Sequence, residues 1–243
     1  MSAPTQEGGM EGQLNAAERQ LLSDAILKAK VKPEVVLEVG TWLGGGSTIH
    51  ILRALEKNGK GHLWGIEADK SIYERMIANI RTAAPETVNR FTPLFGLSQN
   101  VIPKWLAEMG PGLQIDVAFL DGGDNPIEQV TEFRLLDPYM PVGSILAAHD
   151  AKLRKGKWLV PYVSRLDNWE SKLYDISAEG FFSAKKIARH PSPESLRSAR
   201  LHLLRMRFEP AEVAAALLPA KLCKLVLMLV PEKVRRRVAE GRS

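Results

Sequence analysis

The sequence has little cysteine and no long apolar stretch. Cys223 is the only cysteine among 243 residues, which excludes an internal disulfide framework and a cysteine-built metal site. No uninterrupted apolar run approaches the roughly 20 residues that a membrane-spanning helix requires. Residues 1–18 are polar and lack the basic start and apolar core of a secretory signal. These absences predict a cytoplasmic protein.

The formal net charge of +5 is unevenly distributed along the chain. From Lys185 to the carboxyl terminus there are fourteen basic and five acidic residues, which leaves a net charge of −4 for residues 1–184. The basic residues lack interleaved aromatics, so nucleic-acid binding is not expected. Residues 221–230 have an amphipathic helical pattern. This tail could contact an anionic membrane surface peripherally, or pack against the core or a second subunit in a homodimer.

Residues 35–47, VVLEVGTWLGGGS, carry the clearest local pattern. An apolar, β-branched run that ends in glycines is typical of a buried parallel strand entering a tight turn. Ser47 is expected to cap the helix that follows, because apolar residues recur at helical spacing from Ile49 onward. The turn and helix start would present backbone N–H groups to a ligand. A turn that binds no ligand is the alternative.

Two common nucleotide-binding motifs do not fit this turn. A phosphate loop needs lysine where the chain has Gly46, and a dinucleotide turn needs G-x-G-x-x-G, whereas Thr-Trp-Leu follows Gly40. The carboxylate of Glu38, two residues before Gly40, would repel a pyrophosphate. It would attract a ligand that carries an ammonium and a sulfonium group, so the charge favours S-adenosylmethionine.

Strand and helix patterns then alternate to about residue 190. Strands are predicted over residues 61–69, 90–97, 115–120 and 142–148, followed by a hairpin of residues 172–176 and 181–188. With the strand at residue 35, this predicts an α/β fold with a doubly wound, mostly parallel sheet of seven strands. Acidic residues at strand ends, namely Glu67, Asp121 and Asp150, mark one edge of the sheet as the functional side.

We expect two parts in the chain. Residues 1–190 form the α/β domain, with a flexible start over residues 1–12 and an amphipathic helix over residues 13–30. Residues 191–243 form a basic helical carboxyl-terminal extension, which begins with a capped helix start at Ser192-Pro193-Glu194. Two shorter helical segments are predicted at residues 210–218 and 221–230.

The chain resembles the class I S-adenosylmethionine-dependent methyltransferases over about residues 10–190. The matching residues occur in order: Leu37-Glu38-Val39-Gly40 with Trp42 and Gly44, Ile66-Glu67, GLSQNVIP at residues 96–103, Phe119-Leu120-Asp121, and His149-Asp150. It is similar to the O-methyltransferase branch, which includes catechol O-methyltransferase and bacterial enzymes acting on small molecules and sugars. The resemblance implies a Rossmann-like sheet and methyl transfer to a hydroxyl group.

The resemblance also implies the cofactor site. Glu38 and Gly40 would face the methionine end of S-adenosylmethionine, with Trp42 beside it, and Glu67 would hold the ribose. Ser98 and Gln99 would lie along the adenine. The full set of predicted cofactor-binding residues is Glu38, Gly40, Trp42, Gly44, Ser47, Glu67, Ser98, Gln99 and Asp121.

Metal binding and catalysis are implied less completely. Asp121 and Asp150 match positions that ligate magnesium in the metal-dependent members, and carboxylates suit that hard cation. However, Asp124 stands where the catechol enzyme has a catalytic lysine, and Ala151 where it has asparagine. Magnesium is therefore left open. Asp124 and His149 are the predicted catalytic residues, each as a candidate general base, although His149 and Asp121 could instead have structural roles at strand ends.

The sequence thus predicts a methyltransferase that uses S-adenosylmethionine to methylate a small-molecule or sugar hydroxyl. Two alternatives stay open. One is a hydroxylase-like relative on the same fold, and the other is a non-catalytic, cofactor-binding protein tethered by its basic tail.

Overall fold

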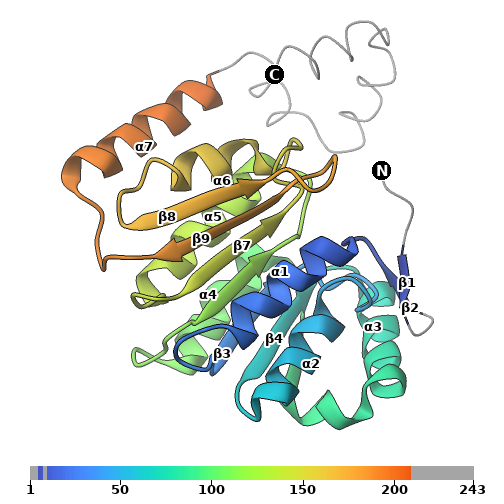
Figure 1. The fold of residues 1–243 in the computed structure, drawn as a ribbon. Coiled ribbons are helices and arrows are strands. Elements are labelled where there is room, and N and C mark those ends of the chain that lie inside the picture. Colours follow the sequence, from blue (N-terminus) through green and yellow to red (C-terminus); the bar gives the residue numbers. More distant parts are fainter. Residues whose placement is uncertain (1–4, 8–9, 209–243) are drawn as a thin grey trace, which may run out of the picture. The chain divides into compact units, whose positions relative to one another are not determined.

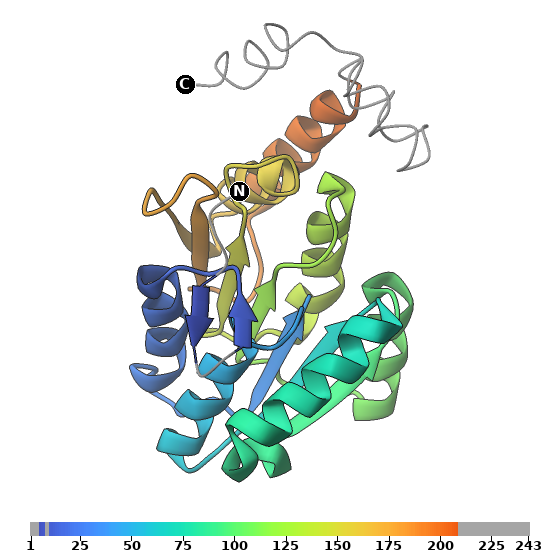
Figure 2. The same ribbon diagram turned by 90° about the vertical axis from the view of Figure 1, so that its right-hand side faces the viewer.

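The computed structural model describes residues 5–7 and 10–208 (Figures 1 and 2). The chain divides into two compact units, Met1–Ala199 and Arg200–Ser243. The helical segments predicted at residues 210–218 and 221–230 lie outside the described residues, and so does the proposed membrane or subunit contact. The domain boundary at residue 190 stays a prediction. Within the described part of the chain, no helix combines the length and apolar character needed to cross a membrane.

A seven-stranded sheet forms the centre of the first unit. Its strands are β3 (Val35–Val39), β4 (His62–Glu67), β5 (Phe91–Phe95), β6 (Val117–Leu120), β7 (Ile145–His149), β8 (Trp169–Tyr174) and β9 (Phe181–Lys186). Their spatial order is β5-β4-β3-β6-β7-β9-β8. All neighbours are parallel except β9, which is antiparallel to both β7 and β8. The predicted doubly wound, mostly parallel sheet of seven strands is therefore confirmed.

Helices cover both faces of this sheet, as the two views show. They are α1 (Ala16–Leu27), α2 (Thr48–Asn58), α3 (Lys70–Ala83), α4 (Ser98–Met109), α5 (Pro126–Leu136) and α6 (Gly156–Val163), and two short 3-10 helices span Pro85–Arg90 and Asp137–Tyr139. Helices α5 and α6 were not predicted. Helix α7 (Pro193–Arg207) starts as predicted, because the Ser192 hydroxyl oxygen accepts a hydrogen bond from the Ser195 N–H at 3.2 Å.

The core on one face joins α1, α2 and α3 to the sheet. Each helix contributes apolar residues spaced three or four positions apart, which places them on one side of the helix. Fully buried examples are Leu22 and Ile26 of α1, Ile51 and Leu55 of α2, and Met76 and Ile80 of α3.

A small hairpin precedes α1. Strands β1 (Thr5–Glu7) and β2 (Met10–Gly12) pair antiparallel, a hairpin that was not predicted. Gly12 lies against the glycine turn, where a Cβ on it would be 2.4 Å from the backbone nitrogen of Gly46. Only glycine permits this approach. Strands of three residues are too short to show the alternation by which strands are predicted.

The register of the sheet brings the ends of four strands to one edge. Val39 pairs with both Ile66 and Leu120, and Leu120 pairs with Ala148. The strands that end here are β3, β4, β6 and β7. The expectation that Glu67, Asp121 and Asp150 share an edge is therefore met.

Gly40 directly follows β3 and lies against the backbone that follows β6. Its φ is 87°, and a Cβ there would lie 2.7 Å from the carbonyl carbon of Asp121. We expect Gly40→Ala to reduce the free energy of unfolding by about 2 kcal/mol or more. Gly59→Ala is the matched control, because Gly59 has a φ of 67° but no atom within 4 Å of its added Cβ.

The control should cost about 1 kcal/mol, the penalty of the left-handed backbone alone. Urea unfolding of the wild type and both variants measures the two losses. Equal losses would mean that the contact between the strands is not the constraint at Gly40.

Candidate active site

A small pocket opens at the edge of the sheet where β3 and β6 end. From β3 the chain continues to β4 and β5 on one side of this point, and from β6 to β7 on the other side. Ligands of open α/β sheets bind at such a change of direction. The pocket is lined by Gly40, Thr41, Trp42, Gly46 and Ser47 of the glycine turn, by Asp121 after β6, and by Gln13 and Leu14 before α1. Four predicted cofactor residues thus meet here, whereas Gln13 and Leu14 were not predicted.

Glu67 connects the end of β4 to the glycine turn. One carboxylate oxygen accepts a hydrogen bond from the Trp42 N–H at 3.0 Å, and the other accepts from the N–H groups of Ala68 and Asp69 at 2.9 and 3.0 Å. The first bond holds Trp42 at a φ of 48°, which is rare for a residue with a side chain. The carboxylate is half-buried, and about one of its four acceptor sites stays available.

Glu38 is completely buried and faces Ser47. The Ser47 hydroxyl donates a hydrogen bond to one carboxyl oxygen of Glu38, and the other oxygen has no hydrogen-bond partner. Burial raises the pKa of Glu38 to about 8, although the Ser47 hydrogen bond opposes this. At neutral pH the side chain is therefore largely protonated and does not present the negative charge that the sequence analysis assigned to it.

The prediction that the side chain of Ser47 caps α2 is wrong. Ser47 does precede α2, but its hydroxyl makes no capping hydrogen bond. Glu38 takes that hydroxyl instead, because a buried carboxyl group without a donor would be costlier than an uncapped helix end.

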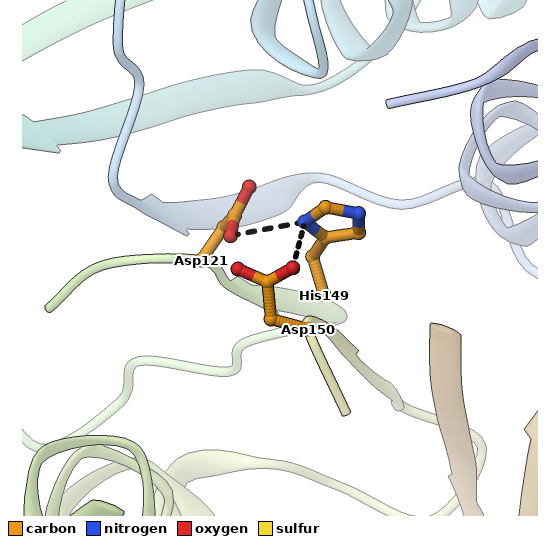
Figure 3. Close-up of side chains that lie close together, drawn as sticks. All are labelled: Asp121, His149 and Asp150. Carbon is orange, nitrogen blue, oxygen red and sulfur yellow. Dashed lines mark ion pairs between the residues drawn. The ribbon is translucent and has the colours of Figure 1, made fainter. Parts of the chain in front are cut away.

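Asp121, which lines the pocket, lies together with His149 and Asp150 (Figure 3). The Nδ1 atom of His149 is 3.4 Å from Asp121 Oδ1 and 3.3 Å from Asp150 Oδ1. Each of the three residues offers one ligand atom to a metal, and these atoms lie within 4.8 Å of one another. The sequence thus predicted two members of this group as metal ligands and the third as a base.

Lys155, which the sequence analysis did not single out, belongs to the same group. Its Nζ lies 2.6 Å from Asp121 Oδ1 and 2.7 Å from Asp150 Oδ2. Burial would raise the pKa of Asp121, but the charges of Lys155 and His149 more than compensate and lower it. Asp121 is therefore a carboxylate at neutral pH.

His149 is held between three carboxylates. Its Nε2 atom is 3.4 Å from Oε2 of Glu18, a residue of α1 that is also fully buried. Burial alone would lower the pKa of His149, but Asp121 and Glu18 raise it to about 10. The imidazole is thus already protonated at neutral pH, which does not favour its predicted role as a base. Glu18 is further fixed by the hydroxyl of Ser177, which donates to its Oε1 at 2.6 Å.

Ser98, the first residue of α4, is buried and turned toward α5. Its hydroxyl donates to Glu132 Oε1 at 2.5 Å, while Glu132 Oε2 has no hydrogen-bond partner. Burial raises the pKa of Glu132 to about 7. The neighbouring Gln99 is half-buried. The adenine contacts of Ser98 and Gln99 stay predictions.

Two further predicted residues lie outside the pocket lining. Gly44 faces α3, where a Cβ would be 3.1 Å from Ile80 Cδ1. Asp124 is exposed in the loop after β6 and is not part of the Asp121, His149 and Asp150 group. The cofactor contact of Gly44 and the catalytic role of Asp124 stay predictions.

Sequence comparison identifies the central part of the chain. Residues 37–151 match the family model described as a methyltransferase domain. This part of the chain is a methyltransferase domain. It begins in β3 and ends two residues after β7, so it includes the glycine turn, Glu67 and the charged group of Asp121, His149 and Asp150. The family expected from the sequence is confirmed, whereas a comparison with curated protein sequences found no significant match.

Solved structures share the fold of this methyltransferase domain. The O-methyltransferase TomG from Streptomyces achromogenes, in complex with S-adenosylmethionine, is 17% identical with a TM-score of 0.61, covering 72% of this chain and 82% of TomG. An O-methyltransferase from Bacillus cereus in complex with S-adenosylhomocysteine is 16% identical with a TM-score of 0.59, covering 72% of this chain and 82% of that one. At such identities the likeness shows the fold.

The buried Glu38 makes stability depend on pH. Its pKa is raised in the folded protein, so the folded state binds more protons than the unfolded state between about pH 4.5 and 8. The free energy of unfolding should therefore fall as pH rises through this window, with Glu38 contributing at most about 1.4 kcal/mol per pH unit. We expect Glu38→Gln to flatten this dependence in urea unfolding measured from pH 5 to 9.

Glu74→Gln, at an exposed site on α3, is the control and should leave the pH dependence unchanged. A Glu38→Gln profile parallel to that of the wild type would show that Glu38 is not protonated in the folded protein.

Proposed function

We propose that the protein transfers the methyl group of S-adenosylmethionine to a hydroxyl oxygen of a small molecule. The observation that carries this proposal is the pocket at the ends of β3 and β6, with the half-buried carboxylate of Glu67 at the neighbouring strand end. The methyltransferase domain and the fold shared with TomG and the Bacillus cereus enzyme support it.

The residues around the pocket fit such a ligand. Gly40 and Gly46 line it with backbone and leave room that a side chain would fill. Ser47, which lines the pocket, directly precedes α2, and the dipole of this helix favours a carboxylate such as that of the methionine moiety. The remaining acceptor site of Glu67 suits a ribose hydroxyl.

When bound, S-adenosylmethionine supplies a methyl group activated by its sulfonium, so that the C–O bond forms as the C–S bond breaks and the electron pair returns to sulfur. The chain must then hold the acceptor oxygen in line and receive its proton. Protonated His149 cannot take that proton. We therefore keep Asp124, an exposed carboxylate in the loop next to Asp121, as the proposed proton acceptor.

Isothermal titration with S-adenosylmethionine and S-adenosylhomocysteine tests the cofactor. We expect both to bind the wild type, and Glu67→Ala to weaken binding at least tenfold, which is about 1.4 kcal/mol, because the ribose loses its acceptor and Trp42 its backbone anchor. Glu74→Ala, an exposed acidic residue on α3, is the matched control and should bind as the wild type does. Absence of binding to the wild type would overturn the proposal.

Transfer of a labelled methyl group to a panel of catechols, other phenols and sugars tests the reaction itself. Binding without transfer to any acceptor would favour a non-catalytic, cofactor-binding protein instead.

A further inference from the structure

The position between Asp121 and Asp150 is already taken by a cation of the chain itself. The Lys155 ammonium lies 2.6 Å from Asp121 Oδ1, 2.7 Å from Asp150 Oδ2 and 3.2 Å from the Asp121 carbonyl oxygen. An ammonium has three hydrogens to donate, and here each has an acceptor. The two carboxylates that would bind a metal are thus bridged by Lys155.

The backbone holds Lys155 in this position. It directly precedes α6, whose first residue, Gly156, packs so closely on the start of the same loop that a Cβ would lie 2.5 Å from the Cα of Ala151. The loop from Asp150 to Lys155 is therefore tightly closed, and the lysine side chain is only 8% exposed. A move of the Lys155 side chain into solvent would break its ion pairs with both Asp121 and Asp150.

The ligands and charges around this position also disfavour a divalent ion. Ala151 follows Asp150 and offers no side-chain oxygen, so water and substrate would have to supply most of the ligands of a divalent ion here. The imidazole of His149 also faces both carboxylates, with its Nδ1 atom 3.4 Å from Asp121 Oδ1 and 3.3 Å from Asp150 Oδ1. A divalent ion placed between them would lie against the buried Lys155 charge and be strongly repelled.

We propose that the Lys155 ammonium takes the place of a divalent metal between Asp121 and Asp150, so that the site works without a bound metal. The metal predicted at these two residues does not fit the side chains present. All three donors of Lys155 are in use, so it is a positioning residue that fixes two carboxylates beside the pocket and does not itself contact the acceptor. The role of Lys155 in catalysis rests on the proposed function, whereas the prediction that the wild type binds no divalent metal here does not.

Titration with Mn²⁺, followed by the loss of the electron paramagnetic resonance signal of the free ion, tests this directly. We expect no saturable binding to the wild type. Lys155→Met removes the ammonium but keeps the length of the stem that carries it, and should create a site for about one Mn²⁺ per chain, bound at least tenfold more tightly than by the wild type. Mn²⁺ should correspondingly raise the Tm of Lys155→Met and not that of the wild type.

Lys152→Met is the matched control, because Lys152 lies in the same loop but pairs with the exposed Asp175. It should gain no Mn²⁺ site, and adding Asp150→Asn to Lys155→Met should abolish the new one. Lys155→Met leaves two buried carboxylates without their cation, which could prevent the variant from folding. In that case Mn²⁺ titration of the wild type and of Lys155→Arg still tests the proposal. Both should leave Mn²⁺ free.

Saturable Mn²⁺ binding to the wild type that Asp150→Asn removes would overturn the proposal, as would a folded Lys155→Met variant that binds no Mn²⁺. These measurements involve neither S-adenosylmethionine nor an acceptor. Their failure is therefore distinguishable from failure of the proposed methyl transfer.

Discussion

The close approach of β3 and β6 at their carboxyl ends determines where everything in this site lies. Gly40 and Gly122 keep side chains out of the contact, since a Cβ on Gly122 would be 2.9 Å from Val39 Cγ1. The chain continues from β3 toward β4 and β5 on one side, and from β6 toward β7 on the other side. The contact between β3 and β6 brings the glycine turn next to Asp121. Because β4 pairs in register with β3, and β7 with β6, Glu67 and His149 lie at the same edge of the sheet.

The buried acids around this edge are neutralised in two different ways. Glu38 and Glu132 face only hydroxyl groups, and burial raises their pKa values to about 8 and about 7. Asp121 and Glu18 face Lys155 and His149, and their pKa values are lowered despite burial. The acids next to cations keep their charge, whereas those next to hydroxyls lose it. The buried ion pairs of the site thus lie on the side of β6 and β7.

Much of this arrangement follows from the sequence because it is encoded locally. Apolar runs such as residues 115–120 can only be buried strands, and the acids directly after them reach one edge wherever the strands are parallel. Lys155 could not be found in this way, because it is one of four basic residues within residues 152–157 and only the closed loop selects it. Glu18 did leave a signal: it continues the apolar stripe of Leu14, Leu22 and Ile26 at a spacing of four residues, as an acid that α1 must bury.

One side of the pocket is formed by residues that precede the methyltransferase domain in the sequence. Gln13 and Leu14 belong to the segment that joins the hairpin to α1, and they lie outside the methyltransferase domain at residues 37–151. Gly12 lies directly on the backbone of the glycine turn, where a side chain would not fit. Gln13 is exposed, so substitutions there alter the pocket without disturbing the strands that carry the remaining site residues, whereas Leu14 is also part of the buried core. Ligand selectivity can therefore be altered at Gln13 while the sheet stays the same.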